Sequence, residues 1–375
     1  MRTVCDLNQC TGCFACISKC SKNAIHIKDD LKTYNAVIDE VLCVNCGQCE
    51  KICPTNNPVS QLHPILWRQG WALDETIRKN ASSGGLASAL SIGFIKAGGV
   101  VCSCVFEKGK FVFDFASSVN DTKRFVGSKY VKSSPDGIYK KIKDYLVYGK
   151  KVLFIGLPCQ AAAVKAYTKD HASLYTVDLI CHGTPSPVTL RMFLNEKGYD
   201  IENMEDVKFR KKAEFYLSNG YKGIEPPSVR DRYMFAFLGS LCYTENCYSC
   251  QYATTERVSD ITLGDSWGSQ LSVEEQAKGI SLILCQNEKG KELLEMASLH
   301  LEDVNVKRAV LNNRQLNRPS SKPTKYELFY RTLEKKKNFS KAVAKCYPKD
   351  CFRQRIKAIL VRTGIGFQGR GISDP

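Results

Sequence analysis

The chain has 375 residues, nineteen of them cysteine, and 54 lysines and arginines against 38 aspartates and glutamates give a formal net charge of +16. Its hydrophobic content of 43% is that of a globular protein and excludes a disordered chain. No secretory signal follows Met1, the longest apolar stretch is too short to span a bilayer, and so many cysteines without a signal indicate reduced thiols. We therefore expect a cytoplasmic location.

Eight cysteines form two runs with the same spacing, offset by 33 residues. This is the spacing of two-cluster ferredoxins, in which three cysteines of one run hold one [4Fe–4S] cluster and the fourth reaches across to the other. One predicted set is Cys10, Cys13, Cys16 and Cys53, and the second is Cys43, Cys46, Cys49 and Cys20. A pair of zinc sites or a disulfide framework is the alternative, but zinc motifs rarely continue to a third and fourth cysteine in this rhythm.

Residues 1–55 should form an α+β ferredoxin-like module with two [4Fe–4S] clusters. Between the cysteine runs, Ala24–Ile27 and Ala36–Ile38 are typical of short strands joined by a polar turn. The segment Pro54–Pro64, with three prolines and Asn56-Asn57, is typical of a linker.

The longer remainder alternates short apolar strands with helices. A helix is expected from Ser82-Ser83-Gly84-Gly85 to about Lys96. Strands are expected at 100–106, 110–115, 151–155, 174–180, 259–263 and 280–285. This order predicts an α/β domain with a mixed, largely parallel sheet, in two parts at residues 65–150 and 151–321, followed by a basic helical tail at 322–375.

A second group of cysteines lies far apart in the sequence. Cys159 and Cys181 each follow a predicted buried strand, which is where open α/β sheets bind ligands. With Cys247 and Cys250 they make a candidate third four-thiolate site, for which Cys242 competes as a ligand. Alternatively, Cys159 and Cys181 are small buried hydrophobic residues and Cys247 with Cys250 is half of a zinc site.

Five motifs together carry a family resemblance. They are Ser82-Ser83-Gly84-Gly85, Ser128-Lys129-Tyr130-Val131, Gly156-Leu157-Pro158-Cys159-Gln160, Asp178-Leu179-Ile180-Cys181-His182-Gly183 and Ser259-Asp260-Ile261-Thr262-Leu263-Gly264-Asp265. Over roughly residues 5 to 300 the chain resembles the beta subunit of coenzyme F-420 hydrogenase/dehydrogenase, in the bacterial form fused to a two-cluster ferredoxin. Plant hydroxymethyl-chlorophyll reductases are relatives of the same family.

The resemblance implies an FAD-binding α/β domain that passes electrons between iron–sulfur clusters and a substrate or deazaflavin. It also implies a third [4Fe–4S] cluster, with Cys159, Cys181, Cys247 and Cys250 at the matching positions. The sequence departs from the family at Leu157, where a threonine is usual, and at Ser266, where an aromatic residue is usual. The basic tail has no counterpart in the archaeal protein.

Candidate flavin contacts come from three places. Ser82, Ser83, Gly84 and Gly85 precede a helix, whose free N–H groups and dipole favour a pyrophosphate; a serine cap without a ligand is the alternative. Lys129 would neutralise phosphate charge, and Asp265 would bond ribose hydroxyls or cap the next turn. His182 is the candidate catalytic residue, as a proton relay to the flavin or a hydrogen-bond donor to a cluster sulfur, against the alternative of an ordinary loop histidine.

Residues 322–375 hold fourteen lysines and arginines against four acidic residues. Such a segment suits an acidic redox protein such as ferredoxin, a partner enzyme or an anionic membrane surface. The alternative is a helical segment that packs on the core through residues such as Phe329, Leu333 and Ile356. Nucleic acid is disfavoured as a partner because no stacking motif or helix-turn-helix accompanies the charge.

The sequence therefore predicts an iron–sulfur flavoprotein oxidoreductase that passes electrons between [4Fe–4S] clusters, FAD and an organic or deazaflavin acceptor. The alternative is an electron-transfer subunit without its own substrate, which docks onto a partner enzyme, for example in polysaccharide biosynthesis. A redox-sensing protein that binds nucleic acid is the third and least favoured interpretation.

Overall fold

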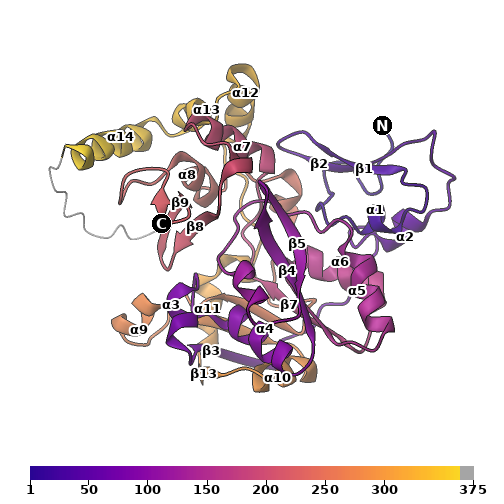
Figure 1. Cartoon of the computed structure of the whole chain (residues 1–375). Coiled ribbons are helices and arrows are strands. Elements are labelled where there is room, and N and C mark those ends of the chain that lie inside the picture. Colours follow the sequence, from indigo (N-terminus) through magenta and orange to yellow (C-terminus); the bar gives the residue numbers. More distant parts are fainter. Residues whose placement is uncertain (364–375) are drawn as a thin grey trace.

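The two cysteine runs fold into a small module built on one β-hairpin (Figure 1). The computed structural model describes residues 1–363 of the chain. In the hairpin, β1 (Ile25–Asp29) pairs antiparallel with β2 (Tyr34–Ile38), which confirms the two predicted strands. Each run ends in a short helix, α1 (Ala15–Lys19) and α2 (Gln48–Ile52). The same local structure thus occurs twice, as the repeated spacing predicts.

An eight-stranded mixed sheet forms the centre of the molecule, in the order β13-β3-β12-β11-β7-β6-β4-β5. Its strands are β3 (Leu66–Ala72), β4 (Val100–Glu107), β5 (Lys110–Ala116), β6 (Val152–Gly156), β7 (Leu174–Leu179), β11 (Ile261–Asp265), β12 (Ser281–Cys285) and β13 (Leu299–Glu302). Only the four central strands, β11, β7, β6 and β4, run parallel. The remaining neighbours pair antiparallel. The prediction of a mixed, largely parallel sheet is therefore confirmed, with the parallel strands in the centre and antiparallel strands at both flanks.

Helices cover both faces of this sheet. Along β6, Val152 and Phe154 pack under α5 (Ile138–Val147) and α6 (Pro158–Thr168). Leu153 and Ile155 point to the other face, under α4 (Leu86–Lys96) and α10 (Glu288–Glu295). A strand whose side chains alternate between two faces and are apolar on both is typical of a buried parallel sheet. It leaves the carboxyl ends of β6, β7 and β11 at one common edge.

A second layer lies over that edge and has its own aromatic core. It comprises α7 (Pro187–Glu196), β8 (Val207–Lys211), β9 (Glu214–Asn219), β10 (Lys222–Gly223), α8 (Arg232–Leu238), α12 (Tyr326–Lys336) and α13 (Phe339–Cys346). Phe193, Phe209, Tyr233, Phe329 and Phe339 are all buried in this core. The remaining helices of residues 1–363 are α3 (Glu75–Asn80), α9 (Val273–Lys278), α11 (Val306–Asn312) and the longer α14 (Pro348–Arg362), with 3₁₀ turns η1 (Asp121–Phe125), η2 (Ile201–Asn203), η3 (Glu245–Ser249) and η4 (Arg314–Leu316).

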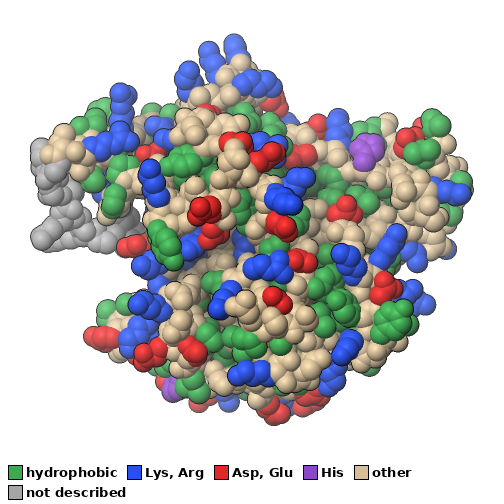
Figure 2. Space-filling model, viewed as in Figure 1, with side chains coloured by type: hydrophobic (Ala, Val, Ile, Leu, Met, Phe, Trp, Pro, Cys, Tyr) green, Lys and Arg blue, Asp and Glu red, His purple; other side chains and the backbone are tan. Residues whose placement is uncertain are grey.

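In the basic C-terminal segment, residues 322–363 contain three helices, of which α12 and α13 belong to the aromatic core, and residues 364–375 lie outside the described part of the chain. Phe329 and Leu333 of α12 are fully buried, as expected if this segment packs on the core. Ile356 and Ile359 of α14 are exposed. Figure 2 shows lysines and arginines gathered over α12 on the outer surface. Within residues 1–363, no helix is long and apolar enough to cross a membrane.

Candidate functional site

The first predicted cysteine set lines one small enclosed cavity. Cys10, Cys13 and Cys16 come from the first run and Cys53 from the second, and the cavity holds all four side chains. Each is at least nine-tenths buried. Cys53 lies directly after α2, which turns it away from its own run and toward the other three. The geometry is therefore that of the crossed pairing expected from the spacing.

A fifth cysteine borders the same cavity and was missed by the sequence analysis. The Cys5 thiol hydrogen-bonds to Cys10 and Cys53, and this contact lowers the pKa of both. Burial raises the pKa of Cys13 to about 12. A thiolate here needs positive charge close by, which the irons of a cluster would supply.

The second predicted set lies at the surface of the same module. Cys46 is exposed, while Cys20, Cys43 and Cys49 are half-buried. Burial raises the pKa of Cys49, and the neighbouring Cys20 contributes to the rise, so the fourth cysteine of the first run lies beside the second run. Three apolar side chains of the adjoining loop are also exposed, Val41 by 93%, Leu42 by 49% and Val44 by 59%. This set is thus accessible to another molecule.

The module docks on the central domain through the loop of the first set. The Tyr139 hydroxyl of α5 donates to the Cys13 carbonyl at 2.5 Å, and the Tyr167 hydroxyl of α6 donates to the Ser18 carbonyl at 3.3 Å. Cys13 packs in the same apolar cluster as α5 and α6, with Cys159 and Cys250 at its border. The first set therefore faces inward, toward the candidate third set.

The four cysteines of the candidate third set come together from three segments. Cys159 lies in the first turn of α6, Cys181 follows β7, and Cys247 and Cys250 lie in and directly after η3. Burial raises the pKa of Cys181 to about 12, and the nearby Cys247 and Cys250 raise it further. Burial also raises the pKa of Cys159, and the nearby Cys181 and Cys250 contribute to this rise. In the described part of the chain no three ligand side chains converge on a point for one metal ion.

A buried arginine holds these segments in place. Arg257 donates to Asp178 Oδ1 at 2.8 Å and to the Leu179 carbonyl at 3.1 Å, both on the strand that leads to Cys181. It also donates to the Tyr252 carbonyl at 2.5 Å, in the segment that carries Cys250. With its side chain 2% exposed, Arg257 fixes the spacing between the two segments. Nothing in its sequence context distinguishes it from a surface arginine.

Cys242, the competing ligand, lies elsewhere. It is fully buried in the aromatic core between α8 and α12, and its carbonyl accepts from the Tyr330 hydroxyl at 3.1 Å. Burial alone raises its pKa, with no other cysteine among the causes. The structure thus brings Cys247, and not Cys242, to the group that includes Cys181.

A cavity of about 1320 Å³ opens at the carboxyl ends of β6, β7 and β11. Its walls come from both layers and from the loops after these strands. Six of the seven predicted flavin or catalytic residues line it: Ser82, Ser83, Gly85, Lys129, His182 and Asp265. Cys181 lines it as well, so the third cysteine set borders the cavity. A cavity of this size, at this place in an α/β sheet, suits a dinucleotide.

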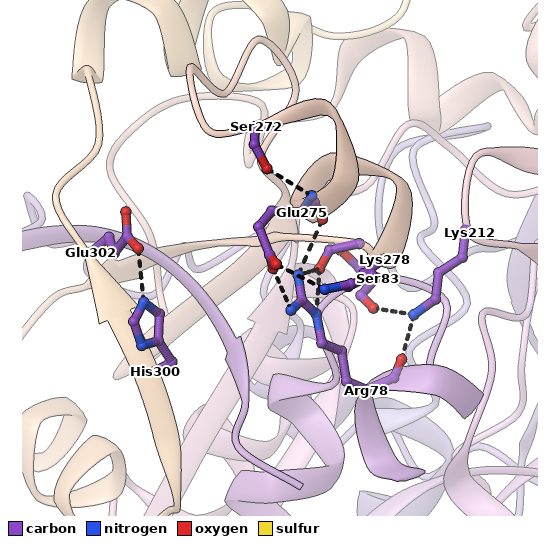
Figure 3. A network of polar contacts seen from close by, with 9 residues as sticks. Arg78, Ser83, Lys212, Ser272, Glu275, Lys278, His300 and Glu302 are labelled. Atoms are coloured by element: carbon purple, nitrogen blue, oxygen red, sulfur yellow. Dashed lines mark hydrogen bonds and ion pairs between the residues drawn. The ribbon is translucent and has the colours of Figure 1, made fainter. Parts of the chain in front are cut away.

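The Ser82–Gly85 loop is held from behind by a polar network, which Figure 3 shows in close view. Lys212 Nζ donates to the Ser83 carbonyl at 2.9 Å and also to the Arg78 carbonyl. Arg78 Nη1 pairs with Glu275 Oε2 at 2.6 Å. Desolvation, together with the charges of Arg78 and Arg210, lowers the pKa of Lys212 to about 8. The network fixes the loop without occupying the cavity side of it.

Gly84 packs behind the loop rather than on the cavity wall. Its N–H donates to Ser281 Oγ at 3.0 Å, and a Cβ at this position would lie 2.5 Å from the Gly70 carbonyl oxygen. Gly85 has φ +88 at the start of α4, a conformation that glycine adopts without strain. Gly84 therefore allows a close approach of two backbone segments, and Gly85 allows the helix to start. Ser82 and Ser83 line the cavity.

Four of the predicted contacts already have partners within the protein. Ser82 Oγ accepts from the Ser128 N–H at 3.0 Å, and Ser83 Oγ donates to the Ile280 carbonyl at 2.9 Å. Lys129 Nζ donates to the carbonyls of Phe125 and Gly127, each at 3.0 Å. Asp265 forms a two-pronged pair with Arg210, at 2.7 and 3.1 Å, and Arg210 also donates to the Tyr130 hydroxyl at 3.2 Å. The sequence analysis missed the Asp265–Arg210 pair, because two charges 55 residues apart carry no signal of contact. Either side chain must exchange partners to bind a ligand directly.

His182 projects into the cavity directly after Cys181. Its side chain is exposed to the cavity, yet the surrounding walls desolvate it, and this burial lowers the pKa of the imidazole. Its backbone carbonyl accepts from Ser320 Oγ at 2.6 Å, which anchors the loop. A neutral imidazole at pH 7 has one nitrogen that donates and one that accepts.

Comparison with protein families gives two matches. Residues 149–307 match the family described as the C terminus of the coenzyme F420 hydrogenase/dehydrogenase beta subunit. Residues 9–57 match the 4Fe-4S dicluster domain. The first match contains Cys159, Cys181, Cys247, Cys250, His182 and Asp265, and the second contains all eight cysteines of the two runs.

Curated relatives come from archaea and bacteria. The beta subunit of an F420-dependent formate dehydrogenase of Methanocaldococcus jannaschii is 26% identical over 238 residues, 60% of this chain and 58% of the relative. The F subunit of the F(420)H(2) dehydrogenase of Methanosarcina mazei is 21% identical over 283 residues, 69% of this chain and 78% of the relative. An uncharacterized ferredoxin-like protein of Haemophilus influenzae is 36% identical over 56 residues, 13% of this chain and 60% of the relative.

Among solved structures, a chain of the F420-reducing [NiFe] hydrogenase complex from Methanosarcina barkeri matches with a TM-score of 0.47 and 18% identity. The match covers 70% of this chain and 97% of that chain.

Proposed function

Because the chain belongs to the family of the coenzyme F420 hydrogenase/dehydrogenase beta subunit and carries a 4Fe-4S dicluster domain, we propose that it conducts electrons between a partner at its surface and an organic acceptor in its large cavity. One observation carries the proposal. The exposed second set, the buried first set, the third set and the cavity follow one another from the surface inward. Such an order suits electron transfer, since each site adjoins the next.

The residues present fit the groups that this role requires. Thiolates are the ligands of iron–sulfur clusters, and each of the three sets offers four cysteines. The cavity offers a helix start at Ser82–Gly85 and room for FAD. Bound there, the clusters would carry single electrons and the flavin would join one-electron to two-electron chemistry. We assign the cluster and flavin residues accordingly.

The protein itself positions these groups and limits access of water. Arg257 fixes the distance between the Cys181 loop and the Cys250 segment, and Tyr139 and Tyr167 fix the ferredoxin module against α5 and α6. The network of Arg78, Lys212 and Glu275 holds Ser82 and Ser83 at the cavity wall. In this proposal rigid contacts keep the centres close, which electron transfer requires.

His182 is the side chain best placed to handle a proton in the cavity. Because its pKa is lowered, the imidazole is neutral at pH 7 and has a free nitrogen that can accept a proton. The neighbouring Asp265–Arg210 pair contributes opposing charges at the same wall. We assign to His182 the relay of a proton between the acceptor and water in the cavity.

The acceptor is an organic molecule, with a deazaflavin as the candidate that the relatives' names suggest. The other candidate function is that of an electron-transfer subunit, with the acceptor bound by a separate enzyme. The exposed Val41, Leu42 and Val44 favour a docked partner in either case. The large cavity favours an acceptor bound in this chain.

Rapid mixing under anaerobic conditions tests the proposal. Full-length protein is loaded with FAD, mixed with a reduced donor, and followed by flavin absorbance. The Cys159→Ser and Cys250→Ser variants should keep FAD and the roughly eight irons of the dicluster domain, yet lose flavin reduction by the donor. Cys242→Ser is the matched control, a buried cysteine outside the three sets, and should behave as the unmodified protein.

Unchanged flavin reduction in Cys159→Ser and Cys250→Ser would contradict the path through the third set. Failure of the unmodified protein to retain FAD would contradict the flavin assignment. Turnover of an organic acceptor only when a second protein is added would favour the electron-transfer subunit.

A further inference from the structure

One buried lysine lies between the first and third cysteine sets. The side chain of Lys132 is nearly inaccessible, at 5% exposed. Its Nζ donates to the Thr11 carbonyl at 3.1 Å, within the loop that carries Cys10 and Cys13. A Cβ on Gly12 of that loop would lie 3.1 Å from Lys132 Cδ, so the side chain packs directly on the loop. The ammonium thus adjoins the first set.

The backbone of the same residue touches the loop of the third set. The Lys132 N–H donates to the Pro185 carbonyl at 3.0 Å. Pro185 follows Thr184, whose N–H donates to Cys247 Sγ at 3.4 Å, and the loop begins at Cys181. In agreement, burial raises the pKa of Cys159, Cys181 and Cys250, and the charge of Lys132 opposes this rise; on the other side, the same charge adds to the lowering of the Cys10 pKa by Cys5.

No carboxylate among residues 1–363 forms an ion pair with Lys132. Its other partner is the ring of Tyr34, whose centre lies 5.0 Å from Nζ. A buried charge is costly unless an opposite charge compensates it. The neighbouring groups able to carry negative charge are the cysteines of the two sets and Asp29, whose Oδ2 accepts from Ser186 Oγ at 2.6 Å without an ion pair to Lys132. A [4Fe–4S] cluster with four thiolates is anionic.

We propose that Lys132 is a shared counter-ion for the groups bound by the first and third cysteine sets, and that its charge sets their reduction potentials. A positive charge at short range in a buried place favours the more negative, reduced state. It would therefore raise both potentials together. This role rests on the proposed function, because it requires an electron to pass between these two sets.

Lys132→Gln and Lys132→Arg separate charge from packing. Gln still donates to the Thr11 carbonyl but carries no charge, whereas Arg keeps the charge. The readout is the midpoint potential of each cluster in full-length protein purified without oxygen, from a redox titration followed by electron paramagnetic resonance. In Lys132→Gln, the equilibrium constant for reducing the first-set and third-set clusters should fall tenfold. For one electron this lowers each midpoint potential by about 59 mV.

Two controls belong to the same experiment. The second set, Cys43, Cys46, Cys49 and Cys20, is an internal standard whose potential should not move. Lys165 is a second buried lysine, 6% exposed, but its Nζ pairs with Asp170 and donates to the Val258 carbonyl. Lys165→Gln should leave all potentials in place, and Lys132→Arg should stay close to the unmodified protein.

Each outcome decides the matter. Unchanged first-set and third-set potentials in Lys132→Gln, or an equal shift of all three clusters, would overturn the proposal. If Lys132→Gln loses iron while Lys132→Arg keeps it, the counter-ion role is supported; if both lose iron, the residue serves packing and the proposal fails. A protein with about eight irons would refute the third cluster, and the first-set potential would then still test Lys132.

Discussion

The two cysteine sets of the ferredoxin module have the same spacing in the sequence but opposite surroundings in the structure. Cys10, Cys13, Cys16 and Cys53 line an enclosed cavity, and their loop is fastened to α5 and α6. In the second set Cys46 is exposed, and Val41 and Val44 beside it project into water. One repeat therefore faces solvent and the other faces the rest of the chain.

This difference shows how a repeated motif acquires two roles. The ligands of both sets follow from local spacing, whereas their environments follow from the one side of the module that docks on the central domain. In the proposed function, the exposed set exchanges electrons with a partner, and the buried set passes them inward away from water. Four predictions test this contrast.

Removing the crossing cysteines should give the largest effect. Cys53→Ser should destroy the buried cluster and Cys20→Ser the exposed one, each with a loss of about four irons. Iron analysis and electron paramagnetic resonance of anaerobic protein measure this. If each substitution instead removes the cluster of its own run, the crossed pairing is wrong.

The exposed set should lose iron first. Because Cys46 is open to solvent and Cys10 is not, a chelator or oxygen should bleach the second cluster several-fold faster than the first. The measurement is the decay of the two resonance signals over time. A single rate for both signals would contradict the difference in access.

An acidic residue in the apolar loop should weaken partner docking. Val44→Asp should raise the KM for a protein donor about tenfold, a change of about 1.4 kcal/mol, because a desolvated contact is lost. Val273→Asp on α9 is the control, since Val273 is also largely exposed, by 76%, but lies far from the module in the sequence. Equal effects of the two substitutions would argue against a docking surface at Val44.

The smallest effect is expected at Arg2. This arginine faces Cys43 and Cys49 but is 37% exposed, and it already pairs with Glu50 at 3.2 Å. Water screens its charge, so Arg2→Gln should lower the potential of the second cluster by less than Lys132→Gln lowers that of the first. A larger shift at Arg2 than at Lys132 would reverse the contrast between exposed and buried sets.

Local patterns in the sequence predicted local features well. The cysteine runs predicted both sets, and apolar runs predicted β4, β5, β6, β7, β11 and β12. The sequence analysis missed two flanking strands, β13 and β3; β3 contains Trp67-Arg68-Gln69-Gly70, a segment without strand alternation, and pairs antiparallel with β12 and β13. The direction of such a strand depends on distant neighbours.

The candidate site shows the same limit. Strand ends predicted that Cys159 and Cys181 meet, with Cys247 and Cys250 as further candidates; the structure brings Cys247 and Cys250 to Cys181 and leaves the competing Cys242 apart. Lys129 was predicted as a phosphate partner, but in the structure its ammonium donates hydrogen bonds to nearby backbone carbonyls. Lys132, three residues later, lies between two cysteine sets because it contacts Thr11 and Pro185. No spacing in the sequence indicates these contacts.

The most direct test of the electron path is the joint iron and flavin content of full-length protein purified without oxygen. The account predicts about twelve irons and one FAD per chain, for three clusters and the cavity. About eight irons without flavin would contradict it, since the path would then end at the buried set of the ferredoxin module.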